Sequence, residues 1–265
     1  AELTTFYAVL MMVNGMAPIL APVLGGQILL LSSWHGIFVV LAGIGMIMAL
    51  ATLIFKETLL PDNRIKSFGA TLRILPELLK DRYFMGHCLL QSFVFMSFFC
   101  YIGSSSFIFQ GIFGVSAQEF SFIFGGLGIG MLVLGPVPAK LAGRVAESRI
   151  LLTAVAVQIV SGLLLLLAFV FTGSLWIVLL FLAGCVMPIS VIATVSFSLA
   201  LNRQGRNAGS ASALLGFFSM FLGAIMMPAA GYFGTATGVP MSVLMLLGFV
   251  LAMVCYQTMI RPDHE

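Results

Sequence analysis

The feature that most constrains this chain is a set of four long stretches with almost no ionised side chains. They cover residues 3–55, 83–139, 150–202 and 207–260, and Glu119 is their only Asp, Glu, Lys or Arg. A helix crosses the roughly 30 Å hydrocarbon core of a bilayer with about 20 apolar residues. Each stretch has 53 to 57 residues, which is enough for two crossings and a turn.

The composition excludes a water-soluble globule. Apolar residues make up 61% of the chain and charged residues 8%, against about 45–50% and about 25% in soluble domains. Membrane strands would give segments of about 10 residues with alternating polarity, which the four stretches do not resemble. The sequence therefore predicts an all-α polytopic protein that lies in a lipid bilayer.

Turn signals divide each stretch into two helices. They lie at residues 27–34, 110–119, 172–174 and 234–240, where Ser, Gly, Thr and Pro gather. This gives eight predicted transmembrane helices in four hairpins. Their expected limits are 5–28, 34–55, 83–108, 120–141, 150–171, 175–198, 208–232 and 240–260.

The basic residues fix the orientation. All twelve Lys and Arg lie between or after the four stretches, and the turns inside the hairpins have none. The positive-inside rule places Lys-rich and Arg-rich connections in the cytoplasm, so both chain ends are expected there. This bias also explains the net charge of +3, and no nucleic-acid partner is needed.

The one long hydrophilic segment, residues 56–82, is the expected domain boundary. Residues 1–55 are interpreted as the last two helices of an amino-terminal six-helix half, and residues 83–265 as the carboxy-terminal six-helix half. Pro22 and Pro228 lie 206 residues apart in matching small-residue patterns, as expected for the internal repeats of transporters. The symmetry implies four further helices before this chain.

A short helix is expected within the hydrophilic segment. Phe68, Leu72, Leu75 and Leu79 recur at helical spacing, and charged residues take the other faces. This pattern is typical of a helix that lies on a membrane surface.

The first hairpin carries a motif. Its residues 14–26 read NGMAPILAPVLGG and resemble the antiporter signature Gly-xxx-Gly-Pro-xx-Gly-Gly, found in the fifth helix of major facilitator drug exporters. The last three motif positions match, alanines replace two of its glycines, and one proline is additional. The motif residues in this chain are Ala17, Pro18, Ala21, Pro22, Gly25 and Gly26.

Together with WHGIF at residues 34–38 and KETL at residues 56–59, the motif is similar to the bicyclomycin-resistance (Bcr/CflA) family. This resemblance implies the last eight of twelve helices of a major facilitator fold. It also implies a monomeric carrier in the bacterial inner membrane that exchanges amphipathic drugs for protons by alternating access. The proton gradient supplies the energy, and no cofactor is expected.

The motif also has a direct physical reading. Small residues let helices approach closely, and Pro22 removes one backbone donor and bends its helix. A bent, closely packed helix between two halves could seal the cavity against leakage while the halves move. Ordinary helix packing without an exchange role is the alternative.

A cavity for lipophilic drugs should be apolar and aromatic, with a few polar groups. Gln91, Phe95, Phe98 and Tyr101 recur at roughly helical spacing and are predicted to share a cavity-lining face. Packing or lipid contact is the alternative for each single residue. Further candidates are Asn14, Phe122, Met187, Phe217 and Phe218.

No Asp, Glu, Lys or Arg lies deep in any predicted helix, although proton antiport requires a titratable group inside the membrane. The resemblance places the acidic coupling position in helices before this chain, so the chain alone is not expected to transport. His87 is expected to be hydrated at the membrane surface, with a proton relay as the alternative. The four cysteines lack metal-ligand spacing, so no metal site is predicted.

Three other functions were compared with drug export. A facilitator-superfamily importer of a sugar or metabolite would need several convergent polar residues in its cavity, and this chain offers few. A non-transporting membrane assembly protein is the alternative from another class. An intramembrane hydrolase is disfavoured because the sequence has no HExxH and no membrane His beside Ser104–Ser106. The chain is thus not expected to be an enzyme.

Overall fold

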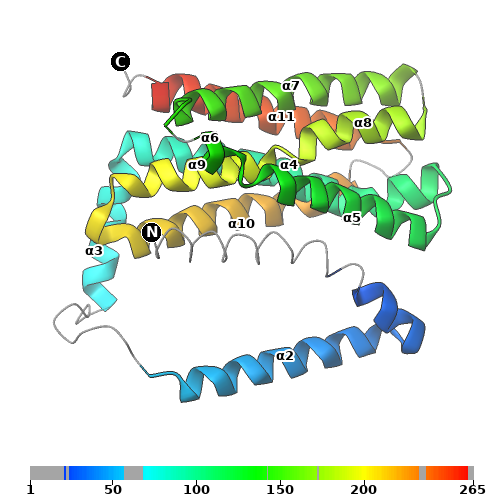
Figure 1. Cartoon of the computed structure of the whole chain (residues 1–265), viewed down its shortest axis with the longest axis horizontal. Coiled ribbons are helices and arrows are strands. Elements are labelled where there is room, and N and C mark those ends of the chain that lie inside the picture. The colour runs from blue at the N-terminus through cyan, green and yellow to red at the C-terminus, as the bar shows by residue number, and fades with distance from the viewer. Residues whose placement is uncertain are drawn as a thin grey trace.

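The computed structural model describes residues 21, 24–56, 68–141, 143–171, 173–232 and 237–261. Within these residues, seven helices are long and apolar enough to cross a membrane, and most of them run side by side as a bundle (Figure 1). The predicted helix 5–28 lies largely outside the described residues, although 24–31 are helical. The described part contains no strand, so the all-α fold class is confirmed.

The helix limits agree with the predicted ones to within a few residues. Two helices end in a π-helical turn, η2 after α4 and η4 after α11. The elements are α2 (Trp34–Ile54), α3 (Phe68–Lys80), α4 (Arg82–Ser106), η2 (Phe107–Ile112), α5 (Ala117–Leu134), α6 (Val137–Leu141), α7 (Glu147–Phe171), α8 (Leu175–Val186), α9 (Ile189–Asn202), η3 (Gly205–Asn207), α10 (Ala208–Tyr232), α11 (Val239–Cys255) and η4 (Tyr256–Ile260).

Proline interrupts two of the predicted helices. The expected helix 120–141 is divided into α5 and α6 at Gly135–Pro136, and the expected helix 175–198 into α8 and α9 at Met187–Pro188. Proline lacks the backbone N–H that the helical ladder needs, and its ring clashes with the preceding turn. These two spans therefore each contain a bend, and the second extends to Asn202.

The predicted turn 110–119 is shorter in the structure. The π-helical turn carries the α4 span to Ile112, and α5 already begins at Ala117. A capping box explains this early start. The Glu119 backbone N–H donates to Ser116 Oγ (3.2 Å), and the Ser116 backbone N–H donates to Glu119 Oε2 (2.9 Å). Glu119, the one charged residue in the four long apolar stretches, thus lies in the first turn of a helix.

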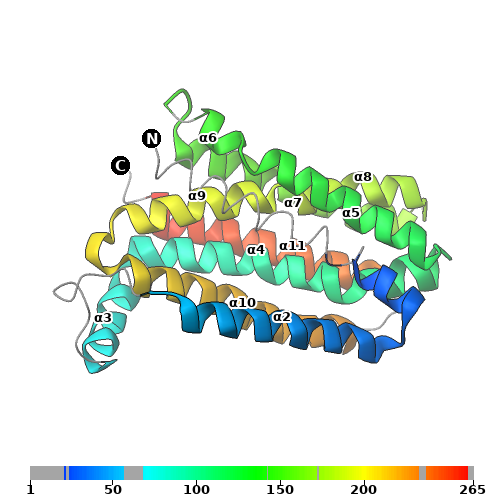
Figure 2. The same ribbon diagram turned by 60° about the horizontal axis from the view of Figure 1, so that its bottom comes forward.

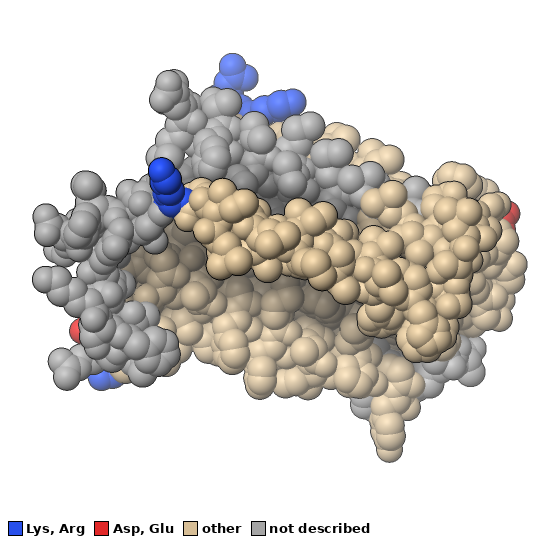
Figure 3. All heavy atoms as spheres, turned by 90° about the horizontal axis from the view of Figure 1, so that it is seen from below, with Lys and Arg blue, Asp and Glu red and all other residues tan. Residues whose placement is uncertain are grey.

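The connections that carry Lys and Arg lie at one end of the bundle. Helix α3, the α9–α10 connection and the end of η4 are found there, whereas the turns between η2 and α5 and between α7 and α8 lie at the opposite end (Figure 1). On the face shown in Figure 3, described Lys and Arg atoms lie toward that same end. We call it the basic end, and it agrees with the predicted one-sided distribution.

Helix α4 is the centre of the packed body. It lies against α9, α10 and α11 (Figure 2), and more than half of its residues are buried. Small residues allow this close packing: an ideal Cβ on Gly248 of α11 would lie 2.7 Å from the Phe93 carbonyl oxygen of α4. By contrast, α2 has no buried residue. The four cysteines are free and buried, as expected of small packing residues.

Helix α3 lies across the basic end rather than along the bundle (Figure 1). Its Leu78 is buried in a cluster with Phe84 and Cys88 of α4 and Leu215 of α10. The predicted helix is therefore present, but it uses part of its apolar surface to pack on the body. Leu79, which belongs to the face predicted to lie on the membrane, is exposed.

Candidate substrate-binding face

The four predicted cavity residues of α4 differ in exposure. Phe95 and Phe98 are half-buried and in edge contact, with their ring centroids 6.3 Å apart. Gln91 is only 7% exposed and Tyr101 only 1%. The helix therefore presents two aromatic rings toward less packed surroundings and encloses the two polar side chains.

Tyr101 is held by aromatic rings on both sides. Its ring stacks on Phe124 of α5, with 5.5 Å between centroids and 17° between planes, and lies 6.2 Å from the ring of Phe98. Its hydroxyl group is buried and has no hydrogen-bond partner among the described residues. A buried polar group without a partner typically lowers the stability of a protein by about 1–3 kcal/mol. Most buried polar groups are therefore hydrogen-bonded, and this hydroxyl is an exception.

Gln91 has one polar partner, on α10. Its Nε2 donates to Ser219 Oγ over 3.5 Å, and Ser219 Oγ donates to the Leu215 carbonyl oxygen over 2.8 Å. Ser219 is 2% exposed. The other polar atom of the amide, Gln91 Oε1, is buried and has no partner in the described structure.

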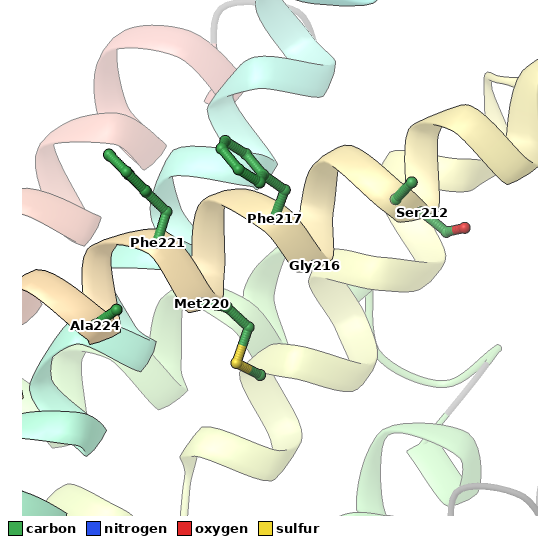
Figure 4. Close-up of a pocket in the computed structure, with 7 residues that line it drawn as sticks. Ser212, Gly216, Phe217, Met220, Phe221 and Ala224 are labelled. Atoms are coloured by element: carbon green, nitrogen blue, oxygen red, sulfur yellow. The ribbon is translucent and has the colours of Figure 1, made fainter. Parts of the chain in front are cut away.

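A shallow groove runs along α10 (Figure 4). Phe217 and Phe221 project from the same side of the helix, with ring centroids 5.5 Å apart and planes 16° apart, and Met220 projects from the opposite side of the helix. All of the lining residues come from α10 and none is charged. They are Ser212, Ala213, Gly216, Phe217, Met220, Phe221 and Ala224.

The remaining predicted cavity residues lie in different surroundings. Phe218 is half-buried and its ring lies 5.6 Å from that of Phe217. Phe122 on α5 is 80% exposed. Met187 lies at the α8–α9 interruption, where its sulfur and methyl group occupy the space that a Cβ on Gly130 of α5 would need. Among these remaining candidates that the structure describes, only Phe217 and Phe218 have rings in contact with each other.

Much of the motif of the first hairpin lies outside the described residues. This applies to Ala17, Pro18 and Pro22, and also to the cavity candidate Asn14. Ala21 is described and exposed. Gly25 and Gly26 are helical, and no described atom lies within 4 Å of a Cβ built on either. The exchange role of the motif stays a prediction.

His87 was expected to be hydrated, and this expectation is wrong. The side chain is fully buried in α4, with its ring 4.7 Å from the ring of Tyr83. Tyr83 is in turn in contact with the α9–α10 connection, because the Arg203 guanidinium lies 3.7 Å from the centre of its ring. The same α9–α10 connection is held by Gln204, whose Nε2 donates to Asp81 Oδ2 over 2.8 Å.

Two further polar contacts join other elements at the basic end. The Arg82 guanidinium donates to the Thr258 carbonyl oxygen of η4. The Tyr256 hydroxyl of η4 donates to the Ser148 carbonyl oxygen at the start of α7, over 3.2 Å. Side chains therefore connect α4, η4 and α7 where the basic connections lie.

Ser219 is the site residue that sequence reasoning missed. It is one of several serines in α10, and only its contact with a residue 128 positions away distinguishes it. A serine inside an apolar span is a weak signal, because its hydroxyl can bond to the carbonyl of the preceding turn. The pairing depends on how α4 and α10 are placed against each other, which periodicity does not give.

This arrangement suits binding of an apolar, aromatic molecule. In the described helices, charged side chains of the spans occur only in their end turns, as with Arg82, Glu119, Lys140, Glu147 and Arg149. The described part has no group of three or more His, Cys, Asp or Glu that could hold a metal. Apart from His87, the buried polar side chains of the described body carry neutral amides and hydroxyls, which orient a ligand through hydrogen bonds.

Comparisons with known proteins agree with this arrangement. The sequence profile of the Major Facilitator Superfamily matches residues 1–228. An uncharacterized MFS-type transporter, YdgK of Bacillus subtilis, is 36% identical over 259 residues, which are 96% of this chain and 64% of that protein. The chain thus spans slightly less than two thirds of the length of this relative.

Two relatives carry names that refer to resistance. The bicyclomycin resistance protein homolog of Haemophilus influenzae is 28% identical over 96% of this chain and 65% of its own length. The multidrug resistance protein MdtL of Vibrio parahaemolyticus is 24% identical over 97% of this chain and 65% of its own length. The predicted resemblance to the bicyclomycin-resistance group is confirmed by these similarities. Because the superfamily profile covers most of a chain with seven described membrane-length helices, this multi-pass membrane protein belongs to the Major Facilitator Superfamily.

Proposed function

We propose that the protein to which this chain belongs exports amphipathic drugs across the bacterial inner (plasma) membrane in exchange for protons. The observation that carries this proposal is the uncharged aromatic surface of α10, where the stacked pair Phe217 and Phe221 lines a groove without a charged residue. Such a surface binds planar lipophilic molecules through apolar contact and, when they are cations, through the ring faces. A sugar would require more polar partners.

Alternating access is the proposed mechanism. Residues 1–55 belong to one half and residues 83–265 to the other, and the basic end faces the cytoplasm. The two halves would rock around a cargo held near the middle of the membrane. The complete carrier is proposed to be monomeric and to use no cofactor. Transport, rather than a bond-making reaction, is its proposed activity.

Efflux of ethidium tests this function. Cells that express a gene of the relatives' full length, including this chain, are loaded with ethidium and compared with cells carrying an empty vector. We expect faster loss of fluorescence, and we expect a proton uncoupler to return the rate to that of the vector. Export that persists with the uncoupler would contradict proton exchange, and no export at all would favour an importer or an assembly protein.

The Tyr101 hydroxyl gives a prediction that separates function from stability. Tyr101→Phe removes a buried hydroxyl without a described partner, so we expect the unfolding free energy to rise by about 1 kcal/mol. If the hydroxyl serves the cargo, the range of exported drugs changes at the same time. Thermal melting in detergent and drug susceptibility of cells measure the two effects.

The matched control for this variant is Tyr256→Phe. The Tyr256 hydroxyl donates to the Ser148 carbonyl oxygen over 3.2 Å, so its removal is expected to lower the melting temperature. A lower melting temperature for Tyr101→Phe as well would show that its hydroxyl is paired. An unchanged drug range would remove Tyr101 from the site.

A further inference from the structure

The contact between Gln91 and Ser219 lies well inside the membrane-length part of the bundle. Gln91 is the tenth residue of α4 and Ser219 the twelfth residue of α10. At about 1.5 Å per residue, both lie roughly 14–17 Å from the start of their helices. Gln91 is thus about a third of the way along the span Arg82–Ile112, and Ser219 is about halfway along α10. Carriers of this kind bind their cargo near the middle of the membrane.

The hydroxyl of Ser219 determines which way the Gln91 amide faces. A serine hydroxyl has a single proton, and Ser219 donates it to the Leu215 carbonyl oxygen over 2.8 Å. Only lone pairs of Ser219 Oγ remain for Gln91. The amide must therefore turn its NH₂ group toward Ser219, over 3.5 Å, and direct Oε1 elsewhere.

Gln91 Oε1 is consequently a fixed acceptor without a donor. Within the described residues no group donates to it, and it is buried. An unsatisfied acceptor in apolar surroundings is costly. Such exceptions are rare in native proteins and call for an explanation, and a ligand that supplies the missing donor is one.

The chemistry of the surroundings indicates the ligand. Among the described residues no Asp or Glu lies in the middle of a span, so a cationic cargo would meet neutral acceptors and aromatic faces there. An amide oxygen accepts from N–H and O–H groups, and most strongly from an N–H that carries positive charge. It gains no such bond from a quaternary ammonium group, which has no proton.

We propose that Gln91 Oε1 is the hydrogen-bond acceptor for cargo that carries an N–H or O–H donor, and that Ser219 is a positioning residue that orients this amide. The inference rests on the proposed export of amphipathic cargo and adds its chemical preference. The 3.5 Å separation between Nε2 and Oγ is at the long limit for a hydrogen bond. This hydrogen bond is therefore weak, and its loss when a cargo reaches the amide costs little.

Two cargo molecules of equal charge, in which a methyl group replaces the N–H hydrogen, test the proposal. (Naphthylmethyl)dimethylammonium has one N–H donor, and (naphthylmethyl)trimethylammonium has none. Binding of each to the purified full-length protein is measured by titration of the cargo fluorescence. We expect the wild type to bind the dimethyl compound more tightly. We expect Gln91→Met, which keeps the volume but has no amide, to weaken the binding of that compound about tenfold and to leave the trimethyl compound unchanged.

The serine variants test the positioning role. Ser219→Ala removes the hydroxyl that orients the Gln91 amide. The preference for the dimethyl compound should therefore fall, but by a smaller factor than in Gln91→Met. Ser219→Thr retains a hydroxyl that can bond to the preceding turn and should restore the preference. The control is Ser97→Ala, because Ser97 is another buried serine, and it bonds to the Met245 carbonyl oxygen of α11 instead. That variant should leave the ratio of the two affinities unchanged.

The outcomes distinguish this inference from the proposed function. Equal weakening of both compounds in Gln91→Met, or the same affinity ratio as in the wild type, would overturn the acceptor role while leaving drug binding intact. A preference that survives Ser219→Ala in full would remove the role of Ser219. If the wild-type protein bound neither compound, the proposed function would fall together with the inference.

Discussion

Gly248→Val should lower the unfolding free energy by about 3 kcal/mol, the upper part of the range for overpacked cores. The first atom of the new side chain would lie 2.7 Å from the Phe93 carbonyl oxygen, which belongs to the backbone of α4 and has no rotamer to change. It would also occupy the place of the Ser97 hydroxyl, which donates to the Met245 carbonyl oxygen over 3.0 Å. Relief of the clash would require α4 and α11 to separate.

Thermal melting in detergent measures this effect, with Gly126→Val as the control. Gly126 is an exposed glycine within α5, and no described atom lies within 4 Å of its would-be Cβ. The control should therefore melt close to the unmodified chain, since it changes only helix propensity. Equal melting temperatures for the two valine variants would show that α4 and α11 are not in close contact at Gly248.

Asp81→Ala should cost about 2 kcal/mol, because one carboxylate serves two contacts. Its Oδ1 accepts from the Phe84 backbone N–H over 3.1 Å and so caps α4. Its Oδ2 accepts from Gln204 Nε2 over 2.8 Å and so holds the α9–α10 connection. Loss of both contacts should increase amide hydrogen exchange at the start of α4 and in residues 203–207.

Two companion variants separate the contacts of Asp81. Asp81→Asn keeps an oxygen for the cap and should recover about half of the loss. Gln204→Ala removes the hydrogen bond from the α9–α10 connection to Asp81 but leaves the cap of α4. It should therefore increase amide hydrogen exchange in residues 203–207 alone. If Gln204→Ala were as damaging as Asp81→Ala, the cap would contribute nothing to stability.

The sequence predicted the limits of the described membrane-length helices to within a few residues, because a charged side chain in hydrocarbon is costly. The exception, Glu119, proved to be part of a capping box with Ser116. The interruptions at Pro136 and Pro188 were visible as prolines, but their effect on helix continuity was not predicted. Local chemistry thus accounts for most of the fold.

Which side of each helix is buried could not be predicted in the same way. Lipid tails are as apolar as the protein interior, so a leucine or phenylalanine has no strong preference between them. This is why Leu78 was missed on α3 and why Tyr101 proved to be more enclosed than expected. Ser219 is distinguished only by its partner on another helix, and this pairing follows from the placement of whole helices.

Helix α3 is attached to the helices that follow it. Leu78 anchors this helix among side chains of α4 and α10, and Asp81 fastens the residues that follow it. Helix α3 is thus packed against the later helices as part of the same body. Any motion of these helices during transport would therefore carry α3 with it.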